Sequence, residues 1–350
     1  MEDDLISKED LSKVLSEKTG RVIKIVSVER IGEGYHSKGF KASASNGESF
    51  FVKKFKSEAQ GFSFPERKIF SLLVSDSMGK RIGNKPKSIG VLLANNNNPE
   101  FVSKIDENTD FYHVQEYEEL GESYFDMLKG RKQKKQITDS DKEEIRKVVD
   151  YIAGVHSIKY YSNDEKVKKE AYNDGLRSVI NNPETTFVIL GELEKDYPIL
   201  NREEQKEYLG LMYDLMHKWR NRFERLSALH GDFWAGNVFF GKDGEMKVID
   251  YSRIPWGDPG IDIGWWLALY IWNYFETRNP YFKELGEFFL DEYEKRTGDK
   301  EIRKAVSIIL GLQGLIFIFP KFYPDIDISL GRRFIGHIKK ILREGRFSWD

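Results

Sequence analysis

The spacing of apolar residues predicts a short helix near the start of the chain. Between Leu11 and Leu15 the apolar residues recur at helical intervals, and Ser7 precedes them in the position of a capping residue, with Asp10 three residues later. The stripe stops at Gly20, a residue type that commonly ends helices. We therefore expect a helix that begins at Ser7 and ends at Gly20.

Short β-branched and aromatic stretches then indicate three strands. The first covers residues 21–28, the second ends at Ser45, and the third runs through residues 51–53. Residues 31–40 read as a glycine-rich loop between the first two strands, and Asn46-Gly47 is typical of a tight hairpin turn before the third. The pattern predicts an antiparallel sheet with a glycine-rich hairpin.

A helix and one more strand complete this part of the chain. The helix should begin at about Pro65, because proline suits the first helical turn. Residues 94–98 form a polar loop, and residues 111–117 have the composition of a strand. We expect a hinge at residues 116–120, where the backbone of Glu116 and Tyr117 could hydrogen-bond a planar ring.

In the rest of the chain, most apolar residues recur at helical spacing. Residues 142–158 place apolar side chains on one face, and residues 172–180 and 203–223 are two further helices. Residues 238–240 and 246–249 read instead as two short strands joined by a turn. The pattern predicts an α+β protein with a small antiparallel sheet in its N-terminal part and a mostly helical C-terminal part.

The same pattern predicts two lobes. We place the N-terminal lobe at residues 1–117 and the C-terminal lobe at residues 118–350, with a helical insertion at about 157–229. Residues 265–275 and 308–319 are the most apolar runs, but both are too short to span a bilayer. We expect them to be buried core helices.

Composition narrows the class of protein without changing this picture. The chain has 350 residues, of which 40% are hydrophobic, so it can bury a substantial core. Its formal net charge of −2 gives no global field toward nucleic acid or an anionic membrane. Cysteine is absent, and the N-terminus is acidic where a signal peptide would be basic. We expect a cytoplasmic protein with neither kind of partner; its oligomeric state is left open.

Three polar residues stand at intervals that suit phosphoryl transfer from a nucleotide. Asp232 and Asn237 have the spacing of the Asp and Asn in the catalytic loop H-R-D-x-x-x-x-N. Asp250 ends the second of the two short strands, which should bring it near Asn237. Asp232 would orient the attacking hydroxyl, while Asn237 and Asp250 offer the hard oxygen ligands that Mg²⁺ prefers.

The N-terminal hairpin supplies candidates for binding the nucleotide phosphates. Gly32 and Gly34 lie in its loop, and Lys53 on the third strand is placed to reach a phosphate. Lys54 competes for this role because adjacent strand residues face opposite sides; the apolar residue before Lys53 favours Lys53. The carboxylate partner of Lys53 would be Glu66, or Glu58 as a substitute.

Together these motifs resemble the aminoglycoside phosphotransferase and choline kinase-like superfamily of small-molecule kinases, over nearly the full length. The resemblance rests on His-Gly-Asp-Phe-Trp-Ala-Gly-Asn (230–237), Val-Ile-Asp-Tyr (248–251), Gly-Asp-Pro-Gly-Ile-Asp (257–262) and Phe-Phe-Val-Lys (50–53). The first of these motifs also looks like the fructosamine kinase branch. The resemblance implies a protein kinase-like bilobal fold, with ATP or another nucleoside triphosphate and Mg²⁺ as cofactors.

The resemblance also implies a role for each matched residue. Asp232 matches the catalytic Asp, Asn237 and Asp250 match the Mg²⁺ ligands, and Lys53 and Glu66 match the phosphate-side ion pair. The remaining matched residues imply structural support of the catalytic loop; they are His230, Asp258 and Asp262.

The leading hypothesis is an enzyme that phosphorylates a hydroxyl of a small molecule such as a sugar derivative, an aminoglycoside or an amino alcohol. A protein kinase is the first alternative, but Tyr251 follows the metal Asp where protein kinases have Phe-Gly, and no A-P-E segment is visible. A nucleotide-binding pseudokinase or regulatory module is the second, although Lys53, Asp232, Asn237 and Asp250 are all present.

The sequence leaves the acceptor undecided. The aromatic residues after the metal site could cage a quaternary ammonium group or could simply belong to a core helix; they are Trp256, Trp265, Trp266, Tyr270, Trp272, Tyr274 and Phe275. The acidic residues Asp291, Asp325 and Asp327 could recognise amines or could lie on a solvated surface.

Overall fold

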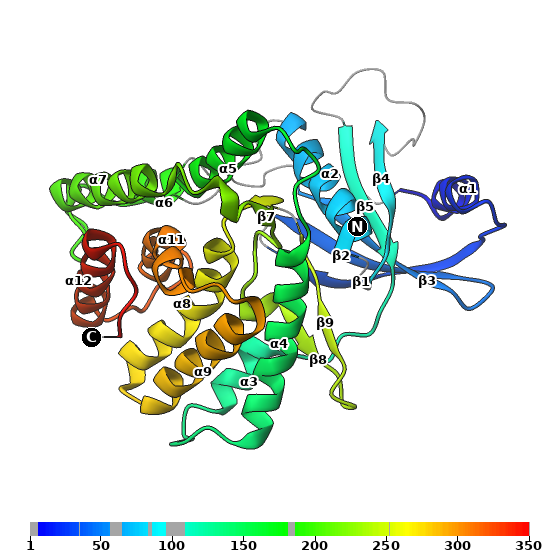
Figure 1. Cartoon of the computed structure of the whole chain (residues 1–350). Helices are drawn as coiled ribbons and strands as arrows, with labels where there is room; N and C mark the ends of the chain where they lie inside the picture. The colour runs from blue at the N-terminus through cyan, green and yellow to red at the C-terminus, as the bar shows by residue number, and fades with distance from the viewer. Residues whose placement is uncertain are drawn as a thin grey trace. The chain divides into compact units, whose positions relative to one another are not determined.

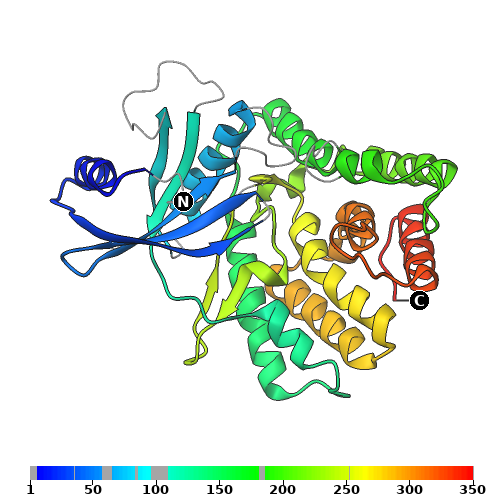
Figure 2. The same ribbon diagram turned by 180° about the vertical axis from the view of Figure 1, so that it is seen from behind.

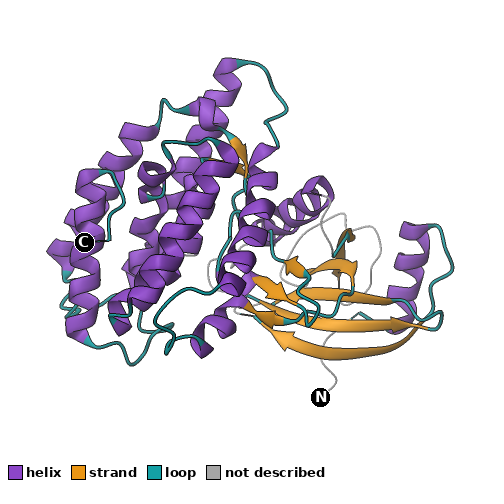
Figure 3. Ribbon diagram, turned by 60° about the horizontal axis from the view of Figure 1, so that its bottom comes forward, coloured by secondary structure: helices purple, strands orange, loops and turns teal. Residues whose placement is uncertain are grey.

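A computed structural model describes residues 6–34, 36–56, 65–82, 86–95, 109–180, 186–251 and 253–349. The chain divides into two compact units. The first unit comprises Met1–Leu120 and Val248–Arg253, and the second comprises Gly121–Lys247 and Ile254–Asp350. Strands gather in the first unit and helices dominate the second (Figure 3). The predicted α+β class, with an antiparallel sheet in the N-terminal part, is confirmed.

A five-stranded antiparallel sheet forms the first unit, in the order β1-β2-β3-β5-β4. Apolar residues lie opposite one another across the ladders, with Phe40 beside Val52 and Val52 beside Val114. All three are buried, so this register directs one face of the sheet into a core. The strands are β1 (Ile25–Glu33), β2 (Ser37–Ala44), β3 (Ser49–Phe55), β4 (Ser88–Asn95) and β5 (Thr109–Glu116).

The first helix, α1 (Lys8–Thr19), covers part of this core, and its predicted ends are confirmed. Ser7 caps it by accepting a hydrogen bond from the Asp10 backbone N–H, and Gly20 ends it in the left-handed conformation with φ of 68°. The Asp10 carboxylate accepts a bond from the Ser7 hydroxyl at 2.6 Å. The cap therefore also pairs the side chains of Ser7 and Asp10.

The glycine-rich segment 31–40 is more regular than predicted. β1 continues to Glu33 and β2 begins at Ser37, so much of the expected loop belongs to strands. Gly32 lies opposite Gly39 across the ladder, beside a register shift between Arg30 and Gly32. Strand pairing accounts for the difference, because it satisfies backbone groups that a loop would leave to water.

Near the sheet, the sequence predicted one helix correctly and missed one strand. Helix α2 (Pro65–Ile82) begins at Pro65 as predicted and packs on β4 and β5 (Figure 1). The sequence pattern missed β4, whose last residues Ala94 and Asn95 were assigned to a polar loop. Residues 96–98 of that expected loop lie outside the described residues.

Helix α8 (Gly260–Thr277) organises the second unit, because nearly all of its side chains are buried. It packs against α9 (Pro280–Thr297) and α11 (Ser307–Phe317). A Cβ at Gly264 would lie 2.2 Å from Cγ2 of Ile309, so glycine is what allows α8 and α11 to approach this closely. The core-helix interpretation of both apolar runs is confirmed.

Further helices surround this centre, and Figure 2 shows α7 and α12 beside α11. They are α3 (Tyr124–Gly130), α4 (Asp139–Ser157), α5 (Glu165–Ile180), α6 (Thr186–Glu192), α7 (Arg202–Trp219), α10 (Ile302–Ala305) and α12 (Ile328–Glu344). Short 3-10 turns lie at η1 (Phe223–Arg225) and η2 (Ala235–Asn237). The remaining strands are β6 (Glu122–Ser123), β7 (Ser227–Ala228), β8 (Val238–Phe240), β9 (Met246–Val248) and β10 (Trp256–Gly257).

Over the described ranges, no helix combines the length and the apolar character that crossing a membrane requires.

Candidate active site

The first unit contains a cavity of about 450 Å³ bordered by the glycine hairpin. Gly32 and Gly34 line it on the hairpin side, and Lys53 lines it from β3. Asp250 reaches the same cavity from the segment Val248–Arg253, which belongs to the first unit although it lies far along the chain. The cavity therefore combines open backbone, one lysine and several acidic residues, of which Asp250 is the one paired with that lysine.

Close packing within the hairpin explains why one of its positions requires glycine. The Gly34 N–H donates to the Ser37 carbonyl at 2.8 Å, which closes the turn between β1 and β2. A Cβ at Gly39 would lie 2.9 Å from the ring of Phe51 on the neighbouring strand. Gly39 thus allows the aromatic ring to pack against the hairpin, while Gly32 leaves open space at the cavity.

The two candidate lysines point in different directions, as adjacent strand residues must. Lys53 Nζ lies 3.0 Å from Asp250 Oδ1. Lys54 Nζ instead lies 2.9 Å from Asp110 Oδ2 and over the ring of Tyr112. The structure thus places Lys53, and not Lys54, at the cavity.

The predicted carboxylate partners of Lys53 cannot be placed in the same way. Glu66 lies in the first turn of α2, but its side chain is outside the described residues. Glu58 lies outside them altogether. Asp250 is the carboxylate that the structure brings to Lys53, a contact that sequence spacing did not suggest.

Asp250 has a strained backbone. Its φ is 68°, in the left-handed region that residues other than glycine rarely adopt. Such a conformation costs on the order of 1 kcal/mol and persists only where surrounding contacts hold it. The ion pair with Lys53 is one such contact.

The expected hinge residues also line the cavity, but much of their backbone is occupied. The Glu116 N–H donates to the Lys87 carbonyl at 2.9 Å, and the Tyr117 N–H donates to the Ser49 carbonyl at 3.0 Å. A planar ring at this position would therefore meet their carbonyl oxygens, and not these two N–H groups. Sequence reasoning did not foresee this, because the bonds depend on strand pairing.

Two histidines near Lys53 are kept neutral. Burial, followed by the positive charges of Arg253 and Lys53, lowers the pKa of His36 to about 4. Burial, followed by Lys53, likewise lowers the pKa of His113 to about 4. His113 also shares a hydrogen bond of 2.8 Å with the Ser88 hydroxyl. With both imidazoles neutral, Lys53 is the residue of the cavity lining that carries a positive charge.

The second unit contains the loop that carries Asp232 and Asn237, and both side chains are buried. The Asn237 amide nitrogen donates to the Asp232 backbone carbonyl at 2.9 Å and lies 3.4 Å from the Asp232 carboxylate. These contacts fix the orientation of the amide, with its nitrogen toward Asp232. The amide oxygen is consequently the end of Asn237 suited to a metal ion.

Asp262 holds this loop from the first turn of α8. Its carboxylate accepts hydrogen bonds from the backbone N–H groups of His230 and Gly231 at 2.7 and 2.9 Å. Gly231 has φ of 83°, and a Cβ there would lie 2.5 Å from the Ile254 backbone. His230 Nδ1 in turn lies 3.3 Å from the Asp232 N–H. The loop thus requires glycine and a buried acceptor to keep its shape.

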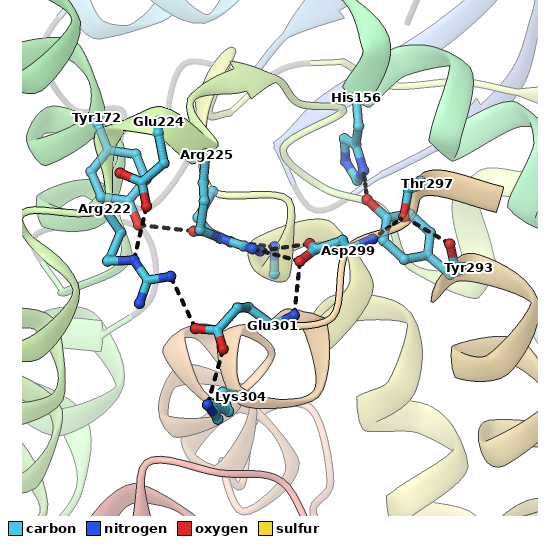
Figure 4. Close-up of polar contacts among 12 residues, drawn as sticks. His156, Tyr172, Arg222, Glu224, Arg225, Tyr293, Thr297, Asp299, Glu301 and Lys304 are labelled. Carbon is cyan, nitrogen blue, oxygen red and sulfur yellow. Dashed lines mark hydrogen bonds and ion pairs between the residues drawn. The ribbon is translucent and has the colours of Figure 1, made fainter. Parts of the chain in front are cut away.

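A second buried carboxylate, Asp258, joins several elements of the second unit. It accepts bonds from the Arg225 guanidinium and, at 2.8 Å, from the Tyr172 hydroxyl. Arg225 also binds Asp299 through two bonds, and Figure 4 shows this arginine between Tyr172 and Asp299. Sequence reasoning named Asp258 but missed its partners, because they lie on separate helices and loops.

The predicted site residues are thus divided between the units. Gly32, Gly34, Lys53 and Asp250 line the cavity of the first unit, whereas the loop bearing Asp232 belongs to the second. Among the described residues, no group of three or more histidine, cysteine or acidic side chains could hold a metal ion. A metal here would need waters or phosphate oxygens to complete its coordination.

A glycine hairpin with a lysine and an aspartate in the first unit, and an Asp-Asn loop held by a helix in the second, are the parts expected of a kinase-like phosphotransferase. A family model, described as the phosphotransferase enzyme family, matches residues 110–304. Because this is more than half of the chain, the protein belongs to the phosphotransferase enzyme family. The predicted superfamily and enzyme class, a small-molecule kinase, are confirmed. No curated protein sequence matches the chain.

Solved structures share the fold at low sequence identity. A putative fructosamine-3-kinase from Haemophilus somnus 129PT is 14% identical with a TM-score of 0.54, covering 94% of this chain and 97% of that one. A thermostable mutant of the aminoglycoside phosphotransferase APH(4)-Ia, in ternary complex with ADP and hygromycin B, is 13% identical with a TM-score of 0.52, covering 97% of this chain and 100% of that one. These likenesses confirm the kinase-like fold.

The depressed pKa of His113 predicts a loss of stability in acid. Because the unfolded chain binds a proton near the ordinary pKa of 6.5 and the folded chain only near 4, stability is complete above pH 6.5 and declines as the pH falls toward 4. His113→Gln should remove roughly 2 kcal/mol of the decline in unfolding free energy between about pH 7 and pH 4.5. Urea unfolding at several pH values measures this, and an unchanged slope would contradict it.

Proposed function

We propose that this protein is an ATP- and Mg²⁺-dependent kinase that transfers the γ-phosphoryl group to a hydroxyl of a small molecule. The observation that carries the proposal is the pairing of Lys53 with Asp250 beside the glycine hairpin. A lysine that contacts phosphates and an aspartate that binds metal are the recurring parts of kinase sites. Family membership supplies the reaction class.

The cavity of the first unit suits a nucleotide. Its volume of about 450 Å³ is within the usual range of small-molecule sites, and apolar side chains such as Phe51 and Ile249 border it. Glu116 and Tyr117 would meet the base through their carbonyl oxygens, while Gly32 and Gly34 would let the backbone approach the phosphates.

The proposed metal ligands have the right chemistry for Mg²⁺. Asp250 offers a carboxylate and Asn237 an amide oxygen, both hard donors. Bound Mg²⁺ would neutralise charge on the phosphate oxygens. The strained backbone of Asp250 supports this role, because such strain is typical of residues whose side chain is held in place for binding or catalysis.

Asp232 is the proposed catalytic residue. Its carboxylate would accept or orient the proton of the attacking hydroxyl, and the Asn237 amide at 3.4 Å keeps that carboxylate in place. His230, Asp258 and Asp262 keep their proposed supporting roles, because their contacts are to the loop and its surroundings.

We place the acceptor in a cavity of about 470 Å³ in the second unit. Phe125 lines this cavity and also packs edge-on against Trp234 with ring centroids 5.6 Å apart. Trp234 is two residues from Asp232, so this ring contact links the cavity lining to the catalytic loop. Its volume admits a compact molecule and not a folded protein, which favours a small-molecule kinase over a protein kinase.

The lining of this second cavity favours an acceptor that carries an amine. Trp272 and Tyr323 contribute rings to the lining, and Asp325 and Asp327 contribute carboxylates. The two lysines of the lining are paired with other carboxylates, Lys129 with Asp126 and Lys132 with Glu276. Burial, followed by the negative charge of Glu276, raises the pKa of Tyr323 to about 12, so its ring stays neutral. The other aromatic residues of α8, including Trp266 and Tyr270, are buried in the core and form no cage.

Lys53 and Lys54 offer a matched test of the nucleotide site. Lys53→Met should weaken ATP binding by about tenfold to a hundredfold, because it removes one charge-assisted contact to phosphate. Lys54→Met removes an equal charge that pairs with Asp110, and should leave binding within about twofold. Calorimetric titration with ATP and Mg²⁺ measures both; equal losses in the two variants would argue against this site.

Asp232→Asn tests the chemistry. The variant should bind ATP normally, while turnover falls by about 10²- to 10⁴-fold because the hydroxyl proton loses its acceptor. The assay is ATP consumption over a panel of fructosamines and other sugars, aminoglycosides, choline, ethanolamine and homoserine. Undiminished turnover would remove Asp232 from the mechanism. Failure of every acceptor with the unaltered protein would favour a regulatory nucleotide-binding module.

Substitution of two exposed aspartates, one in the lining and one outside it, tests the acceptor cavity. Asp325→Asn should raise the KM for an amine-bearing acceptor by about two- to fivefold, as expected for one exposed charge contact. Asp291 lies outside the cavity and binds Arg303 at 2.6 Å, so Asp291→Asn is the control and should leave KM unchanged. An equal effect of both changes, or of neither, would place the acceptor elsewhere.

A further inference from the structure

A lysine and a glutamate of the cavity proposed for the acceptor form an ion pair within its lining. Lys132 Nζ lies 2.6 Å from Glu276 Oε2, and each side chain is 36% exposed. Both residues line the cavity of about 470 Å³ in the second unit. A pair this accessible to water contributes little to stability, so its two charges exchange partners at small cost. The pair is therefore open to competition from a charged ligand.

The position of Glu276 on α8 favours a cation beside it. Glu276 lies one residue before Thr277, the last residue of the helix. The carbonyl groups at a helix C-terminus carry partial negative charge, which disfavours a carboxylate there and favours a cation. The charge of Glu276 is also felt at Tyr323 in the lining, where burial, followed by Glu276, raises the pKa to about 12. A positive charge at this place reduces the repulsion between Glu276 and the helix end.

The face of α8 that carries Glu276 supplies the other groups that an ammonium ion binds. Its residues recur at intervals of three and four and line the cavity together; they are Leu269, Trp272, Asn273 and Glu276. The Asn273 amide nitrogen donates to the Leu269 carbonyl at 2.8 Å, so the polar atom left for a ligand is the amide oxygen, an acceptor. An ammonium group has several N–H donors and a positive charge, which suit a carboxylate, an amide oxygen and an indole ring.

The loop that carries Lys132 is held independently of this ion pair. The Asn279 amide nitrogen donates to the backbone carbonyls of Lys132 and Lys134 at 3.0 and 2.6 Å. Lys134 also binds Asp141, a carboxylate with no exposed surface, at 3.0 Å. These contacts fix the backbone of the loop, so the side chain of Lys132 can leave Glu276 while the loop stays in place.

We propose that Glu276 is a specificity-determining residue that binds the ammonium group of the acceptor, and that Lys132 occupies this position until the acceptor displaces it. The inference rests on the proposed function of the cavity as the acceptor site. Lys132 acts as an internal competitor for Glu276. An uncharged ligand cannot replace the ammonium group of Lys132, so the exchange selects acceptors that carry a positive charge.

Removal of the lysine should make the cavity bind amines more tightly, which a purely structural ion pair would not do. We expect Lys132→Met to tighten the binding of butylammonium by about two- to fivefold, because Glu276 loses its internal partner. Glu276→Gln should weaken butylammonium binding by about fivefold, because the carboxylate is lost. The uncharged counterpart, 1-butanol, should bind equally to all three proteins. NMR titration at constant ionic strength measures these dissociation constants.

Lys129 offers a matched control within the same lining. It pairs with Asp126 at 2.9 Å, and Asp126 is not part of the lining. Lys129→Met therefore removes an equal charge without freeing Glu276, and its effect on butylammonium should stay below about twofold. In the double variant of Lys132→Met with Glu276→Gln, the gain from the first change should vanish. Equal gains in Lys132→Met and Lys129→Met, or a gain that persists in the double variant, would overturn the proposal.

Turnover provides a second readout, which separates this inference from the proposed function. With ethanolamine as the acceptor, Lys132→Met should lower KM by a similar factor and Glu276→Gln should raise it. If the unaltered protein phosphorylates no acceptor, the proposed function fails, and the titrations still decide whether Glu276 binds ammonium. If an acceptor is phosphorylated but neither change alters its KM or the binding of butylammonium, the proposed function stands and the role of Glu276 is refuted.

Discussion

The carboxylate of Asp262 is the group on which the shape of the loop bearing Asp232 and Asn237 depends. It has no exposed surface, so its charge must be balanced by donors from the protein itself. Those donors are the backbone of His230 and Gly231 and the ring of His156. The need to satisfy one buried charge therefore fixes the start of the loop that carries Asp232.

Helix α8 can present Asp262 so rigidly because the rest of the helix is apolar and closely packed. Gly264 lets α11 approach α8, and α9 covers the opposite side while contributing Tyr293, whose hydroxyl lies 2.7 Å from His156 Nδ1. Packing and polar chemistry are thus coupled, since the elements that bury α8 also orient its carboxylate. The nearby contacts of Asp258 with Arg225 and Tyr172 follow the same principle.

In the first unit, the main structural constraint is to hold the positive charge of Lys53 beside a cavity. Lys53 is set by the register of β3, and Asp250 is brought to it by a short segment from much later in the chain. Neutral His36 and His113 add no competing charge. The ion pair with Asp250 and the two neutral imidazoles thus set the charge around Lys53.

The sequence by itself determined several of the helices and strands and the candidate residues of the site. Apolar spacing revealed α1 and the two core helices, and the intervals between Asp232, Asn237 and Asp250 indicated phosphoryl transfer, because both signals are local in the chain. Tertiary structure alone decided that Lys53 meets Asp250, that β4 joins the sheet, and that His156 reaches Asp262. These contacts join residues distant in sequence, and their pairing depends on strand register and helix packing, which no local pattern specifies.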